Sequence, residues 1–74
     1  MAIEEVPYSQ FMKMLENGEI YKADIYQDSI LFQTKPDENG KSKYYSIAYM
    51  KDNVLADKLY ERGVEFTPII EKES

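Results

Sequence analysis

The chain has 74 residues, no cysteine and no histidine, and fourteen acidic against nine basic residues give it a formal net charge of −5. This length allows one small domain, and the missing cysteine and histidine exclude a disulfide and an ordinary zinc site. The negative charge disfavours nucleic acid and anionic membrane surfaces as partners. No apolar run approaches the ~18 residues that a membrane span needs, so we expect this piece to be soluble as it stands.

A short helix is predicted over about residues 9–17. Pro7 favours an extended conformation at Val6, and Ser9 is placed to cap the first turn with its hydroxyl. Gly18 is predicted to end the helix, since glycine adopts the left-handed turn at little steric cost. Three apolar residues share the face that should reach the core: Phe11, Met12 and Leu15.

A β-meander is predicted after this helix. Residues 20–26 and 30–34 alternate between apolar and polar side chains around a polar turn, which is typical of a β-hairpin. Residues 36–42 are the most loop-like stretch of the chain. Residues 43–48 again favour a strand, so the hairpin gains a third strand.

The second predicted helix begins after Asp52, a favoured N-cap residue. Leu55 and Leu59 lie four residues apart on its apolar face. Gly63 ends the helix, and a short final strand follows. Because Pro68 has no N–H to offer a ladder, that strand ends there or lies at a sheet edge.

Together these elements predict an α+β fold, a small two-layer domain in the order helix, three strands, helix, strand. The sheet is expected to be mainly antiparallel, with both helices packed on it. Residues 6–70 form the domain in this interpretation. Residues 1–5 are read as a lead-in or expression start, and residues 71–74 as a tail toward a transmembrane segment that the sequence lacks.

No residue set predicts catalysis. The Ser9 hydroxyl lacks an adjacent base, because there is no histidine and no Ser-x-x-Lys pattern. The loop at Asp37–Gly40 lacks the alternating ligands of a calcium loop. Paired carboxylates fall in turns or on exposed strand faces. The segment is therefore predicted to be no enzyme, with no catalytic, cofactor-binding or metal-binding residue.

Seven tyrosines in this short chain are more than a thin core would be expected to hold. Tyr44, Tyr45 and Tyr49 lie close together in sequence and are candidates for a contact surface, where tyrosine is enriched. Strand packing plus covering surface is the preferred explanation of these tyrosines, with the contact surface as the alternative. The alternation pattern leaves open whether Tyr44 or Tyr45 faces the core.

The pattern resembles the extracytoplasmic domain of FtsH-type proteases. Residues 6–20, Val-Pro-Tyr-Ser-Gln-Phe-Met-Lys-Met-Leu-Glu-Asn-Gly-Glu-Ile, resemble its opening "YS-x-F-x-x-x-[aliphatic]-x-x-G-x-[aliphatic]". Residues 55–66 resemble its closing helix, turn and strand. The central hairpin is matched by four residues: Ala23, Ile25, Ile30 and Phe32. The connector 36–42 is longer than usual, and Lys51-Asp52-Asn53-Val54 lacks the proline common before the second helix.

The resemblance implies a membrane-anchored, ATP-dependent zinc metalloprotease of the AAA class, usually a hexameric ring, that acts in membrane protein quality control. This domain would lie outside the cytoplasm between two transmembrane helices, and ATP and zinc would belong to parts absent here. Its implied roles are ring assembly, access of membrane substrates and regulator binding. The excised piece is expected to be monomeric, and Val6 and Glu71 should emerge on the same side.

An alternative interpretation is a free-standing small peptide- or protein-binding module. Such a module would take a peptide along an exposed strand edge. Flanking apolar segments with a downstream nucleotide-binding loop and a His-Glu-x-x-His site would favour the protease, and saturable peptide binding along one strand would favour the module.

Overall fold

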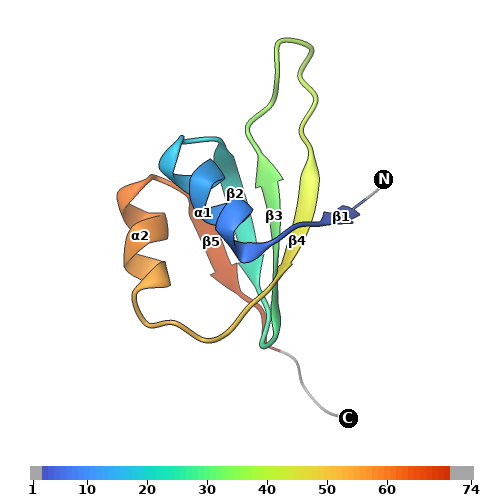
Figure 1. The fold of residues 1–74 in the computed structure, drawn as a ribbon. Coiled ribbons are helices and arrows are strands. Elements are labelled where there is room, and N and C mark those ends of the chain that lie inside the picture. Colours follow the sequence, from blue (N-terminus) through green and yellow to red (C-terminus); the bar gives the residue numbers. More distant parts are fainter. Residues whose placement is uncertain (1–2, 71–74) are drawn as a thin grey trace.

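The computed structural model describes residues 3–70, which form two helices and five strands (Figure 1). The predicted tail at residues 71–74 lies outside this range. The elements in chain order are β1 (Ile3–Glu5), α1 (Tyr8–Glu16), β2 (Ile20–Ile25), β3 (Ser29–Thr34), β4 (Tyr44–Ala48), α2 (Leu55–Glu61) and β5 (Glu65–Pro68).

The strands form one mixed sheet in the order β1-β4-β3-β2-β5. The inner pairs β2–β3 and β3–β4 are antiparallel, whereas the outer pairs β1–β4 and β2–β5 are parallel. The α+β class with two helices is confirmed, and the sheet is mixed: its longer central pairs are antiparallel, as expected, and its two outer pairs are parallel. The reason lies in α1 and α2, because each helix returns the chain so that the strand after it runs parallel to the strand before it.

Strand β1 was read as a lead-in from the sequence, and that reading is wrong for Ile3–Glu5. These residues pair with Tyr44–Ser46 of β4, and the backbone N–H of Val6 continues the ladder by donating to the carbonyl of Ser46 at 2.9 Å. All three β1 residues are exposed. Their sequence therefore carries no alternating burial signal, and the strand exists because β4 offers it a free edge.

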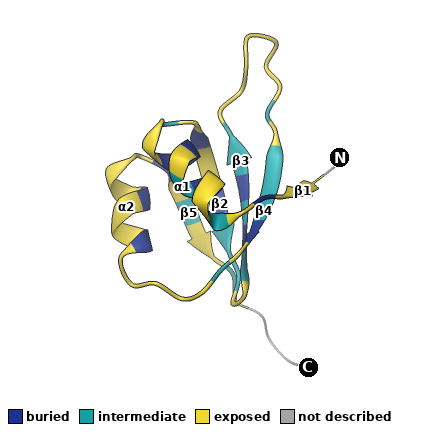
Figure 2. Cartoon of the chain, in the orientation of Figure 1, coloured by how far each residue is buried: buried dark blue, intermediate teal, exposed yellow. Residues whose placement is uncertain are grey.

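Both helices pack on one face of the sheet (Figures 1 and 2). The cross-strand register places Ala23, Phe32 and Tyr45 in one row on this face. Met14 is buried, whereas Met12, expected in the core, is only half-buried at its margin. The buried core consists of Val6, Phe11, Met14, Leu15, Ile20, Ala23, Ile30, Phe32, Ile47, Leu55, Leu59 and Val64.

The start of α1 differs from the sequence prediction. Its N-cap is Pro7, in extended conformation, and no side chain caps the helix. Ser9 was expected to be the cap, but it is an exposed residue inside the first turn. The carbonyl of Pro7 instead accepts the N–H groups of Gln10 and Phe11, at 3.0 and 3.3 Å. Proline suits this boundary because its fixed φ leads directly into the helix.

The start of α2 is also set slightly differently from the prediction. The helix begins at Leu55 with Val54 as its N-cap, rather than Asp52. Asp52 still shapes the preceding turn, because its Oδ1 accepts the N–H of Val54 at 2.9 Å. Its carbonyl also accepts the N–H of Leu55 at 3.2 Å.

The predicted glycine stops lie where both helices end. Gly18 and Gly63 have φ of 72° and 70°. After α1, the N–H groups of Gly18 and Glu19 donate to the carbonyls of Leu15 and Met14, at 3.1 and 3.0 Å. This pair of hydrogen bonds is the Schellman motif, which satisfies carbonyl groups that the helix itself leaves free.

The two ends of the described chain leave the sheet in opposite directions. Since β2 and β4 both run against β3, the strands β1, β2, β4 and β5 all point the same way. The chain thus enters at Ile3 from one end of the sheet and leaves after Pro68 at the other, on the opposite edge (Figure 1). The expectation that Val6 and Glu71 emerge on the same side concerns Glu71, which lies outside the described residues, so it stays a prediction.

Candidate contact surface

The three tyrosines singled out from the sequence do not form one cluster. Tyr45 faces the helices and stacks on Phe32, with ring centroids 5.5 Å apart. Tyr44 is on the opposite, uncovered face, where it borders a shallow hollow beside Leu31. Tyr49 lies beyond the end of β4. The register of β4 against β3 therefore settles the question left open by the sequence: Tyr45 faces the core and is half-buried at its margin.

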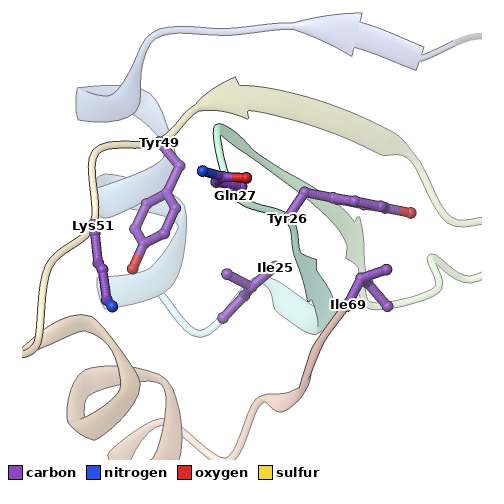
Figure 3. A pocket seen from close by; sticks show the side chains of 6 residues that line it. All are labelled: Ile25, Tyr26, Gln27, Tyr49, Lys51 and Ile69. Atoms are coloured by element: carbon purple, nitrogen blue, oxygen red, sulfur yellow. The ribbon is translucent and has the colours of Figure 1, made fainter. Parts of the chain in front are cut away.

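Tyr49 separates two hollows at the end of the sheet where β5 leaves. The first has a volume of about 300 Å³ and lies beside the β2–β3 turn (Figure 3). Figure 3 shows Tyr49 and Lys51 on one side of it, Ile69 and Tyr26 on the other, and Ile25 between them. The second hollow, of about 490 Å³, is lined by Tyr8, Ala48, Tyr49, Met50, Lys51 and Asp52. We call the residues lining these two hollows the Tyr49 surface.

The loop after β4 fixes this surface. The backbone N–H of Asp52 donates to the Tyr49 hydroxyl at 3.2 Å, which ties the ring to the turn that starts α2. Tyr8 reaches the same place from the first turn of α1, and its ring meets Phe11 edge-on at 5.7 Å. The buried Phe11 thus supports Tyr8, one residue of a surface assembled from segments far apart in the sequence.

Burial raises the pKa of the Tyr8 phenol above its ordinary value of 10.0, and the nearby charges of Asp52 and Tyr49 raise this pKa further. All three causes disfavour the tyrosinate form. The raised pKa means that the folded state holds this proton more tightly than the unfolded state does. Its contribution to stability is thus complete below pH 10 and is lost as pH rises through the folded-state pKa.

We expect the free energy of unfolding of Tyr8→Phe to fall less than that of the parent as the pH rises above 10. Urea unfolding from neutral pH to above pH 10 measures this. Asp52→Asn should reduce the loss partly, because it removes one of the charges that oppose ionisation. Tyr60→Phe controls for the loss of one phenol, since Tyr60 is 79% exposed on α2. An alkaline slope that is equal in Tyr8→Phe and the parent would contradict the role of Tyr8.

The chemistry of the Tyr49 surface suits contact with a partner. Tyrosine and methionine are enriched where proteins meet, and Met50 exposes 87% of its side chain here. Lys51 adds a flexible cation beside the rings. Within residues 3–70, no three His, Cys, Asp or Glu side chains gather in a way that could hold a metal ion.

Most of the Tyr49 surface could not be found from the sequence. Tyr8, Tyr26 and Ile69 belong to three different segments, and only the folded sheet brings two of them into one hollow. A usable signal was the apolar Met50 next to Tyr49 in the connection before α2.

Comparison with known proteins agrees with the resemblance seen in the sequence. Residues 1–71 match the family described as FtsH Extracellular. The chain is 31% identical over 65 residues to the ATP-dependent zinc metalloprotease FtsH of Methylococcus capsulatus, covering 86% of this chain and 10% of that protein. It is 27% identical over 70 residues to the protein of the same name from Pseudomonas putida, covering 95% of this chain and 11% of that protein.

The chain thus spans about a tenth of the length of these curated relatives. Among the helices of residues 3–70, none has the length and apolar character required to cross a membrane. The family match covers the helix-to-strand units at both ends of the chain and the meander between them. This chain belongs to the FtsH extracellular domain family.

Proposed function

We propose that this chain is the non-catalytic, membrane-proximal domain of an FtsH-like AAA protease. In this proposal it lies on the extracytoplasmic side and contributes to ring assembly, substrate access and regulator binding in membrane protein quality control. ATP and zinc act in other parts of the parent protein. The observation that carries the proposal is the family match over residues 1–71.

The Tyr49 surface supports the contact role. This surface contains two hollows, of about 300 and 490 Å³, together with exposed aromatic and apolar side chains. Hollows of this size accept side chains of a protein partner, which supports a role in holding substrates or regulators. Copies tethered in one membrane reach a high effective concentration, so a weak lateral contact suffices for a ring and an excised domain stays monomeric.

The described chain enters at one end of the sheet and leaves at the other, which places a condition on the segments that connect it to a membrane. For both ends to reach one bilayer, the connecting segment on one side must run back along the domain. A strand such as β2 has six residues and is about 20 Å long at ~3.3 Å per residue, a distance that roughly six extended residues cover. We therefore expect one connector of about that length between this domain and its membrane helix.

The alternative of a free-standing module that pairs peptides along a strand edge has little support in the structure. Edge strand β1 has only three residues, two of them glutamates. Edge strand β5 ends at Pro68, which lacks an N–H. Short, charged and proline-ended edges are the features by which proteins discourage strand addition.

The coding sequence around this segment gives the first test. We expect apolar stretches of ~20 residues on both sides, followed downstream by a nucleotide-binding loop and a His-Glu-x-x-His site. A reading frame without these features would reject the protease assignment.

In the parent protease, Met50→Asp should slow degradation of a membrane-embedded substrate about fivefold or more, because a charge on a contact surface removes a contact worth ~1 kcal/mol or more. Hydrolysis of ATP and cleavage of a small soluble peptide should not change. Tyr60→Asp is the matched control, since Tyr60 is 79% exposed but lies outside the Tyr49 surface. Equal membrane-substrate rates in both variants would refute the contact role.

A further inference from the structure

Another hollow, separate from the Tyr49 surface, lies between the β3–β4 hairpin and the end of α1. Its volume is about 410 Å³. The hairpin extends well beyond the sheet at the end opposite to the β2–β3 turn (Figure 1). The hollow is lined by Met14, Gly18, Glu19, Thr34, Lys35, Asp37, Lys41, Lys43 and Tyr45.

The hollow has an apolar part and a basic part. Met14 is 9% exposed and belongs to the core, and Tyr45 is held in place by stacking on Phe32. Around them, the hairpin contributes three lysines: Lys35, Lys41 and Lys43. A ligand here would therefore meet an apolar surface and ammonium groups together.

Charge sets this place apart from the rest of the molecule. Residues 35–43 hold three lysines and two carboxylates, whereas the remainder of the chain holds six basic and twelve acidic residues. Two carboxylates line the hollow, those of Asp37 and Glu19, and each accepts a hydrogen bond. Asp37 Oδ1 accepts the backbone N–H groups of Asn39 and Lys41, at 2.8 and 3.0 Å, and Glu19 Oε2 accepts the amide of Asn17 at 3.3 Å. Within the described residues 3–70, the ammonium groups of the three lysines make no hydrogen bond or ion pair with a protein group.

The hairpin is ordered before any ligand arrives. Its base continues the ladder, with the N–H of Thr34 donating to the carbonyl of Lys43 and the N–H of Lys43 donating to Thr34 Oγ1, both at 2.9 Å. The N–H of Lys35 donates to the carbonyl of Glu19 at 2.9 Å and ties the hairpin to the turn after α1. A ligand therefore meets a preformed wall, which lowers the entropy cost of binding.

From these observations we infer that the hollow binds an acidic peptide segment that carries an apolar side chain. The apolar side chain lies against Met14 and Tyr45, and flanking carboxylates pair with the lysines of the hairpin. The volume of the hollow, about 410 Å³, is within the range of small-ligand sites, about 300–1,000 Å³. The inference concerns a different surface from the one proposed above and stands without the protease assignment.

The test uses the 74-residue chain and the blocked peptide Glu-Glu-Phe-Glu-Glu. We expect saturable changes in the amide NMR signals of residues 35–43 and of Gly18 and Glu19, and binding that weakens as salt is added. Replacing Lys35, Lys41 and Lys43 by serine should weaken the affinity about tenfold, since each exposed ion pair contributes modestly. Because these side chains are exposed, the variant should keep its fold.

Three controls make the result specific. Lys58→Ser removes one exposed positive charge on α2, away from this hollow and from the Tyr49 surface, and should leave the affinity unchanged. The peptides Lys-Lys-Phe-Lys-Lys and Glu-Glu-Ser-Glu-Glu should bind more weakly, the first through charge and the second through loss of the apolar side chain. Equal affinity in the triple-serine variant would overturn the inference. Signal changes in the hairpin that follow protein concentration without peptide would also overturn it, because they would assign the hollow to a second copy of the chain.

Discussion

Replacing Phe11 by alanine is expected to lower the free energy of unfolding by about 3–5 kcal/mol. The Phe11 side chain is fully buried at 0% exposure. Its ring meets Tyr8 at 5.7 Å and Phe32 at 5.0 Å, both edge-on. The loss combines the transfer of a phenyl group to water, a cavity between the helices and the sheet, and two aromatic contacts.

This loss is large relative to the whole stability of such a chain, which is on the order of 4–11 kcal/mol at this length. The variant should therefore be partly unfolded at room temperature or have a strongly lowered urea midpoint, followed by circular dichroism. Tyr60→Ala is the control, because a side chain that is 79% exposed should contribute within about 0.5 kcal/mol. A loss below about 1 kcal/mol for Phe11→Ala would show that the core closes around the gap.

Gly63→Ala is expected to lower the free energy of unfolding by about 1–2 kcal/mol, through backbone strain alone. Gly63 has a φ of 70°, and a Cβ built there meets nothing within 4 Å. Its N–H donates to the carbonyl of Tyr60 at 3.1 Å, and the N–H of Val64 donates to the carbonyl of Leu59 at 3.0 Å. Alanine must either keep this strained geometry or give up both bonds.

Two replacements at the same position separate strain from bulk. Gly63→Asn should cost less than alanine, because asparagine tolerates the left-handed region. D-alanine, introduced by chemical synthesis of the chain, places a methyl group in the same open space while favouring positive φ. It should raise stability by about 0.4–1 kcal/mol by restricting the unfolded chain. Equal losses for L- and D-alanine would show that the methyl group, rather than φ, causes the effect.

The sequence by itself determined the features that depend on neighbouring residues. Gly18 and Gly63 end their helices at the predicted positions because only glycine adopts a positive φ without strain. The alternation of residues 20–26 and 30–34 predicted the hairpin of β2 and β3, in which Ala23, Ile30 and Phe32 are buried on one face. The absence of cysteine, histidine and catalytic patterns likewise needed no structure.

The features that the sequence left undecided depend on contacts between distant segments. Ile3–Glu5 form a strand only because β4 has a free edge, and the choice between Tyr44 and Tyr45 follows from the register of β4 on β3. The Tyr49 surface and the hairpin hollow each join side chains from separate elements. Local preferences fix where helices and strands begin and end, but which surfaces meet is decided by the packing of the whole sheet against its helices, and no short window of sequence contains that information.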